Sequence, residues 1–126
     1  MARARAVLGL IAGAILILSS AGHSILGWKE LSGSLTAAHV PTELVLGLQV
    51  GWQFGGVAML ALGVILLALF ARRWRGEPVS LLPAATVAVA YLGFGAWALL
   101  ASNFDPFFLV FIVPGVLLAL ASASRN

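Results

Sequence analysis

The side chains that could do chemistry in this sequence are few, and all of them lie within long apolar stretches. They are uncharged hydrogen-bonding or aromatic groups, with one histidine among them. Such groups can bind a small molecule by hydrogen bonding and stacking, or they can join neighbouring helices to one another. The candidate ligand-binding set is His23, Gln49, Trp52, Gln53, Tyr91 and Trp97.

Helical geometry predicts that several of these side chains lie at similar depths in a membrane. Counted at ~1.5 Å per residue from the middle of each apolar stretch, His23 lies ~9 Å and Gln53 ~6 Å toward the same surface, while Tyr91 lies near the middle. Polar side chains inside a membrane normally face the interior of a helix bundle. We therefore expect a shared polar cluster in the outer half of the bundle. Hydrogen bonding between helices is its simplest role.

Patterns for catalysis and metal binding are scarce. The sequence has no cysteine, which excludes disulfides, thiolate nucleophiles and cysteine-ligated clusters. Its two histidines, His23 and His39, are too few for a metal site unless carboxylates such as Glu43 and Asp105 join them. It has no Gly-x-Ser-x-Gly elbow, His-Glu-x-x-His helix or phosphate-binding glycine loop. We therefore expect a protein that is not an enzyme, and we assign it no catalytic residue, metal or cofactor.

The elements that must position these side chains are long apolar segments. Hydrophobic residues make up 62% of the 126-residue chain and charged residues only 9%, and the mean hydropathy is +1.10. This composition leaves too little polar surface to cover a soluble globule. Since a crossing needs about 20 apolar residues, the sequence predicts a single domain over residues 1–126, an all-α, four-helix membrane bundle with short loops. The expected spans are residues 6–28, 44–70, 79–102 and 106–123.

Basic residues predict the orientation of this bundle. All arginines fall on one side of the predicted membrane, whereas Lys29 falls on the other. By the positive-inside rule, both termini are cytoplasmic, and residues 29–43 and 103–105 face outward. Short loops and an alanine- and arginine-rich composition favour a bacterial inner (plasma) membrane. The arginines are Arg3, Arg5, Arg72, Arg73, Arg75 and Arg125.

The beginning of the chain has a second interpretation. Residues 1–21 also fit a cleavable secretory signal, because a basic start and an apolar run precede Ser19, Ser20 and Ala21. The apolar run continues to Trp28, which favours a retained span.

The connections carry local signals as well. Apolar residues recur at helical spacing within residues 29–43, which predicts a short helix lying on the membrane surface. Asp105 followed by Pro106 predicts a helix start directly after a tight turn, because a carboxylate can accept from the free N–H groups of the first helical turn.

Small residues predict where the helices touch. Helices in lipid approach one another through small side chains, because the hydrophobic effect drives their association only weakly. The second span has two such faces, one with Gly47, Gly51 and Gly55 at four-residue spacing and another with both glutamines. Two faces are typical of a helix in the middle of a bundle, or of one that also meets a partner. The faces of the first and third spans are Gly9, Ala12, Leu16, Ser19, Ser20, His23 and Gly27, and Ala84, Ala88, Tyr91, Gly95, Ala98 and Ser102.

These patterns favour a small structural or accessory membrane subunit that packs through its small-residue faces against itself or a larger membrane complex. The first alternative is binding of a hydrophobic or amphipathic small molecule, such as a lipid, quinone or pigment, in an outer-half pocket around His23, Gln49 and Gln53. A lesser alternative is an oligomeric channel or transporter for a neutral solute, because no charged residue lies deep in a span. The expected partner is the lipid bilayer and not nucleic acid.

Overall fold

The computed structural model describes residues 2–123, and every regular element in this part of the chain is helical. In chain order the elements are α1 (Ala2–Ala21), η1 (Gly22–Gly27), α2 (Trp28–Ala37), α3 (Thr42–Trp74), α4 (Leu82–Ala101), η2 (Pro106–Phe108) and α5 (Leu109–Ser122). η1 is a π-helix and η2 is a single 3-10 turn, whereas the others are α-helices. The all-α prediction is confirmed.

Three helical segments of the described residues are long and apolar enough to cross a membrane. They are Arg3–Ala37, Thr42–Trp74 and Leu82–Ala101. The last apolar segment, Pro106–Ser122, is shorter. Three segments therefore have the length and apolar character that a membrane span needs, while a fourth crossing and the direction of each crossing stay predictions.

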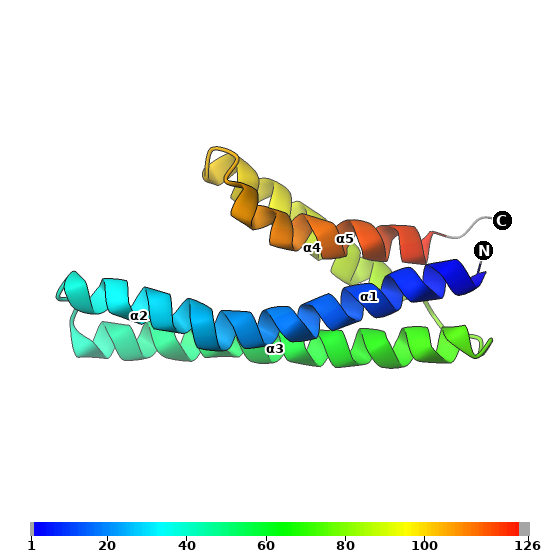
Figure 1. Ribbon diagram of the computed structural model, residues 1–126, viewed down its shortest axis with the longest axis horizontal. Coiled ribbons are helices and arrows are strands. Elements are labelled where there is room, and N and C mark those ends of the chain that lie inside the picture. Colours follow the sequence, from blue (N-terminus) through cyan, green and yellow to red (C-terminus); the bar gives the residue numbers. More distant parts are fainter. Residues whose placement is uncertain (1, 124–126) are drawn as a thin grey trace.

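The first helix extends further than the sequence predicts. The sequence predicts a span ending near Trp28 and a separate surface helix after it, but α1, η1 and α2 form one continuous rod (Figure 1). Residues 29–37 contain no proline to stop the helix, and Leu31 and Leu35 are half-buried where α2 contacts α3. The rod ends at a turn in which His39 has a positive φ of 54°.

α1 and α3 pack side by side in antiparallel fashion. Their backbones approach closely at Gly63, where an added Cβ would lie 2.7 Å from a side-chain atom of Ile17 and 3.0 Å from the carbonyl oxygen of Gly13. At the other end of the contact, Gly9 has no room for a Cβ beside the Phe70 ring. The face that meets α3 thus includes part of the predicted small-residue face, namely Gly9, His23 and Gly27, and adds Gly13 and Ile17, which that prediction did not contain.

α4 and α5 form a second, shorter antiparallel hairpin. An added Cβ at Gly95 would lie 2.7 Å from a side-chain atom of α5, so the predicted small-residue face of α4 packs against α5. The turn between them is tight, with positive φ angles of 56° at Asn103 and 64° at Phe104. Asp105 then accepts a hydrogen bond from the N–H of Phe107 at 2.9 Å. This confirms the predicted helix start.

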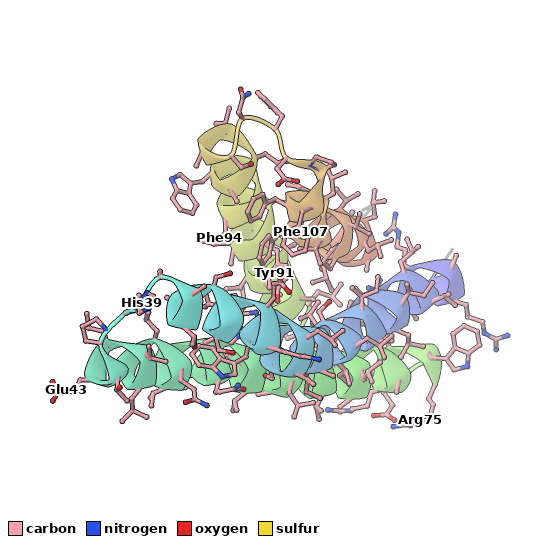
Figure 2. The ribbon with its side chains drawn as sticks, turned by 60° about the vertical axis from the view of Figure 1, so that its left-hand side comes forward. His39, Glu43, Arg75, Tyr91, Phe94 and Phe107 are labelled. Carbon is pink, nitrogen blue, oxygen red and sulfur yellow. The ribbon has the colours of Figure 1, made fainter. Side chains whose placement is uncertain are left out.

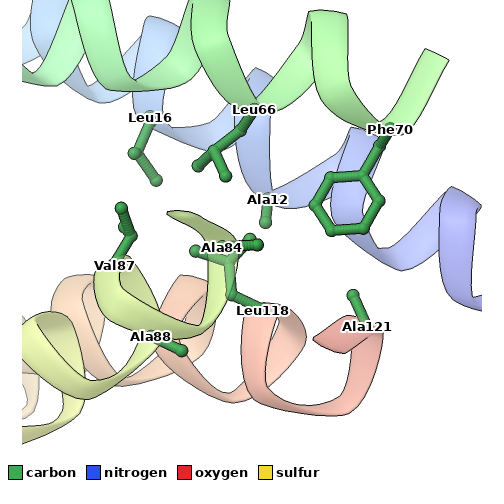
Figure 3. Packing of buried hydrophobic residues seen from close by; sticks show 9 residues of the cluster. All are labelled: Ala12, Leu16, Leu66, Phe70, Ala84, Val87, Ala88, Leu118 and Ala121. Atoms are coloured by element: carbon green, nitrogen blue, oxygen red, sulfur yellow. The ribbon is translucent and has the colours of Figure 1, made fainter. Parts of the chain in front are cut away.

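The two hairpins meet mainly at one end. Figure 1 shows them close together where both chain ends lie and separated at the opposite end, and α5 contacts α1. The shared core belongs to the end where they meet, and Figure 3 shows its side chains converging from all four long helices. Its buried members are Ala12, Leu16, Leu66, Phe70, Ala84, Val87, Ala88, Leu118 and Ala121.

The predicted bundle would keep all four helices in contact along their whole length, whereas the two hairpins of the structure pack together at one end only. Four alanines in the shared core allow the hairpins to approach at that end. Further out, large apolar side chains such as Leu18 and Phe54 are more than 70% exposed, and the small face of α4 is occupied by α5. The two hairpins therefore separate in the half that the sequence predicts to contain the polar cluster.

Candidate functional site

The polar contact between η1 and α3 is built around His23 and Trp52. The Nε2 atom of His23 lies 2.9 Å from the carbonyl oxygen of Trp52, and the indole Nε1 of Trp52 donates to the carbonyl oxygen of His23 at 2.7 Å. The two rings stack with centroids 4.3 Å apart and planes 6° apart. Because a carbonyl oxygen can only accept, Nε2 of His23 carries the hydrogen and is the donor in this contact. Each of the two residues thus donates to the backbone of the other.

The neighbouring residues repeat this pattern one position along each helix. The side-chain nitrogen of Gln53 donates to the carbonyl oxygen of Ser24 at 3.0 Å. The two accepting carbonyls, those of His23 and Ser24, belong to the π-helical segment. In a π-helix an N–H group bonds to the carbonyl five residues back, as the N–H of Trp28 does to His23. The widened turn therefore presents carbonyl oxygens that also accept from side-chain donors of α3. The carbonyl oxygen of His23 accepts two hydrogen bonds, one from the N–H of Trp28 and one from the indole of Trp52.

Glycines make the space for this contact. An added Cβ at Gly27 would lie 3.0 Å from the indole ring of Trp52, and one at Gly55 would lie 3.1 Å from Nε2 of His23. At Gly56 an added Cβ would overlap the hydroxyl oxygen of Ser24. The ring of His23 faces Trp52 and Gly55, so residues of the same chain occupy the space beside the ring.

The structure separates the other predicted site residues from this contact. Gln49 is half-buried one helical turn from Gln53 on α3. Tyr91 lies on α4, where its ring packs 6.0 Å from that of Phe111 (Figure 2). Trp97 is 62% exposed, on the second hairpin. Of the six candidates, His23, Trp52 and Gln53 come together, and a ligand-binding role for any of them stays a prediction.

The carboxylates that could join a histidine lie on different hairpins. Glu43 is exposed in the first turn of α3, close to the turn that contains His39 (Figure 2). Asp105 is in the turn of the second hairpin, where it caps η2. Within residues 2–123, no group of three His, Asp or Glu side chains is placed to hold a metal ion.

Arginines at the other end of the molecule hold the end of α5. Arg73 donates to the carbonyl oxygen of Ala121 at 2.7 Å, and Arg5 donates to that of Ala123. The last carbonyls of a helix lack partners within the helix and carry partial negative charge, so these cations satisfy them and favour the helix dipole. The sequence identifies these arginines only as membrane anchors. Arg125 lies outside the described residues.

Two further arginines share one carboxylate. The Nε of Arg72 lies 2.7 Å from one oxygen of Glu77, and the Nε of Arg75 lies 2.9 Å from the other. The hydrogen bond from Arg72, followed by that from Arg75, lowers the pKa of Glu77 below its ordinary value. The carboxylate is therefore ionised near neutral pH, and the group of three carries one net positive charge.

Two adjoining cavities lie at this arginine-bearing end. One, of about 430 Å³, is an open hollow between α3 and residues 78–80. The other, of about 350 Å³, lies between α3 and the first turns of α4, and Ile65 lines both. They lie far along α3 from the contact between His23 and Trp52, in a region where the sequence analysis predicts no site.

Known proteins add no assignment to this geometry. No family model matches the chain, and neither a curated protein nor a solved structure matches it. A proposal for its function therefore stands on contacts, exposure and charge alone.

Proposed function

We propose that this chain is a non-catalytic structural or accessory subunit of a membrane assembly, and that the outer half of α3 packs against a helix of another chain. The observation that carries the proposal is that no described residue packs against Gly47 or Gly51. A Cβ added at either glycine would meet no atom within 4 Å, whereas Gly55 and Gly56 are closely covered by η1.

The physical argument concerns the energy of glycine in a helix. A glycine in a helix interior is about 1 kcal/mol less favourable than alanine. Two glycines four residues apart create a shallow groove, through which another helix in lipid can approach closely enough for backbone contact. Within residues 2–123, no atom lies within 4 Å of a Cβ added at Gly47 or Gly51, so this part of the chain leaves the groove open. A partner helix would give these two glycines the packing that Gly63 receives from α1.

The surroundings of the groove support the same role. Leu44, Val50 and Phe54 flank it on the helix surface and are 61%, 64% and 71% exposed. Large apolar side chains beside a small-residue groove are suited to pack around a helix that enters it. The polar groups of His23 and Trp52 are already engaged with each other, which favours an architectural role for that contact.

The proposal includes the orientation predicted from charge. Both described chain ends lie with Arg72, Arg73 and Arg75 at one end of the molecule, and Lys29 lies toward the other. In a bacterial inner membrane the arginine-bearing end would face the cytoplasm. Residues 106–122 would form the fourth crossing, about 25 Å long at the usual helical rise, which is slightly less than the hydrocarbon thickness.

Site-directed cross-linking tests this proposal directly, because the natural chain has no cysteine. Gly51→Cys in native membranes is expected to give a covalent adduct with a second chain under mild oxidation or with a short bis-maleimide. Leu46→Cys, 59% exposed on the same stretch but about 140° around α3 from Gly51, is the matched control and should give much less. Native mass spectrometry of the gently solubilised protein then identifies the second chain.

Two results would count against the proposal. One is a lone chain in native mass spectrometry together with equal cross-linking at both positions. The other concerns Gly51→Leu, which fills the groove at a position where an added Cβ has no described atom within 4 Å. That variant should fold normally and lose the assembly, so an unchanged assembly would contradict the role of the groove.

A further inference from the structure

The two cavities at the arginine-bearing end adjoin each other along α3. Their lining on α3 runs from Leu62 to Arg72, which corresponds to about 15 Å of helix. The opposite wall is made by residues 78–80 and then by residues 82–87 of α4. Together they form one groove parallel to α3, and we call it the α3 groove.

The polarity of the α3 groove changes along its length. The part beside α4 is lined by apolar residues and by Thr86, whose hydroxyl already donates to the carbonyl oxygen of Leu82 at 2.9 Å. The part nearer the end of α3 adds Arg72 and Ser80, both exposed. A molecule that fits this gradient has a long apolar part and a polar end that accepts hydrogen bonds.

The charge at the polar end favours an anion. Arg72 and Arg75 each use Nε to bind the same carboxylate of Glu77, so two positive charges face one negative charge. The hydrogen bond from Arg72 to Glu77 uses Nε, and the Arg72 side chain is 56% exposed. A guanidinium group binds phosphate oxygens well through paired N–H donors. By contrast, a terminal nitrogen of Arg73 is already committed to the end of α5.

The position of the groove matches a lipid. It runs beside apolar spans and reaches the end of the molecule where the arginines lie, which is the level of the head groups of one leaflet. We propose that the α3 groove binds an anionic phospholipid, with an acyl chain along α3 and the phosphate against Arg72. This rests on the membrane placement of the helices but not on the partner contact at Gly51, so each proposal can fail alone.

Native mass spectrometry of the full-length protein with defined lipids tests the head-group part. Phosphatidylglycerol and phosphatidylcholine with identical acyl chains are added to the detergent-solubilised protein. One arginine near the lipid surface corresponds to a preference of about fivefold for the anionic lipid. Arg72→Gln should abolish that preference, whereas Arg3→Gln, exposed at the same end but outside the groove, should retain it. Equal binding of both lipids by the natural chain, or equal losses in both variants, would overturn the proposal.

A second pair of variants tests the acyl-chain part. Ala68 lines the groove and Ala61 does not, although both are exposed on α3. Ala68→Trp should reduce retained phosphatidylglycerol severalfold, and Ala61→Trp should leave it unchanged. Binding that is equally insensitive to both tryptophans would mean that the groove is not the binding site.

A measurement on the natural chain avoids any folding defect that the substitutions could cause. Phosphatidylglycerol with a photoreactive acyl chain is bound and cross-linked, and the adducts are mapped by peptide mass spectrometry. Adducts concentrated in residues 62–72 and 78–87 are expected from the lining of the two cavities. Adducts spread evenly over the lipid-facing surface would show only a general lipid shell and would refute the specific site.

Discussion

At the scale of single residues, the contact between His23 and Trp52 combines two kinds of interaction. Two hydrogen bonds join side chains to backbone carbonyls, and the rings stack at 4.3 Å. Hydrogen bonds between membrane helices average about 0.6 kcal/mol, and aromatic pairs contribute about 0.5 to 1.5 kcal/mol beyond the area they bury. Stacking therefore contributes about as much as one hydrogen bond at the lower end of this range and more than twice as much at the upper end.

We expect His23→Leu to lower the free energy of unfolding in detergent micelles by about 1 to 2 kcal/mol, because it removes the ring stack and one hydrogen bond. Trp52→Phe keeps a stacked ring but loses the indole donor, so its effect should be smaller. Leu26→Ala is the control, since Leu26 is 69% exposed. The measurement is chemical denaturation followed by circular dichroism. A His23→Leu variant as stable as the natural chain would contradict a structural role and would favour the ligand-binding alternative.

The sequence allows part of this contact to be predicted. Depth along a helix follows from residue number, and this placed His23 and Gln53 at compatible heights, as the structure confirms through the neighbouring pair Ser24 and Gln53. The partner that stacks on the histidine depends on the rotation of α3 about its axis. Rotation is set by packing with α1 and is not fixed by residue number.

At the scale of elements, the glycines of α3 differ in what surrounds them. Gly63 meets backbone atoms of α1, with the carbonyl oxygen of Gly13 3.0 Å and the amide nitrogen of Ile17 3.1 Å from an added Cβ. Backbone cannot move aside as a flexible side chain can. Gly51, on an open face, has no such neighbours. The same residue type therefore has different roles at two positions of one helix.

We expect Gly63→Ala to destabilise the protein by about 1 to 3 kcal/mol, because the added methyl group forces α1 and α3 apart. Gly51→Ala should leave the stability of the single chain unchanged or raise it by up to about 1 kcal/mol, because alanine favours helix. Thermal unfolding in a detergent that keeps the chain monomeric provides the measurement. If the two substitutions had equal effects, the pairing of α1 with α3 would be wrong.

Sequence patterns also locate most element boundaries. The turn at Asn103 and the start at Asp105 follow from residue types that favour a left-handed conformation and a helix cap. The continuation of the first helix into α2 does not follow from the sequence, because polar residues such as Lys29 and Glu30 imitate the end of a span. Hydropathy reports contact with lipid, whereas a helix continues wherever its backbone bonds continue.

At the scale of the whole molecule, the pairing of faces decides which predictions hold. The small face of α4 at Gly95 could meet α1, α3 or α5, and the structure shows that it meets α5. This choice places Tyr91 beside Phe111 and away from the contact made by His23. Sequence identifies such faces but gives no order of preference among them, and the polar cluster expected in the outer half therefore does not include Tyr91 and Trp97 in the structure.

We expect residues 74 and 104 to lie on opposite sides of the membrane, as the charge distribution predicts. A membrane-impermeant maleimide added to intact cells should label Phe104→Cys, whereas Trp74→Cys should react only after the membrane is opened. Arg3→Cys is the control for the inner side. Labelling of both Trp74→Cys and Phe104→Cys from outside would reject the proposed orientation, and with it the placement of the α3 groove in the inner leaflet.

The π-helical turn has a consequence for the angular phase of the first rod. Relative to an unbroken α-helix, a π-helical turn rotates the helix that follows it by about one residue, roughly 100°, so residues 31 and 35 lie where residues 30 and 34 would otherwise lie. In the structure Glu30 and Ser34 are exposed, and Leu31 and Leu35 are half-buried. One surplus residue accommodated between Gly22 and Gly27 rotates the outer end of the rod by that amount. The rotation keeps the carboxylate of Glu30 out of the apolar contact between α2 and α3, some 10 Å along the helix from His23.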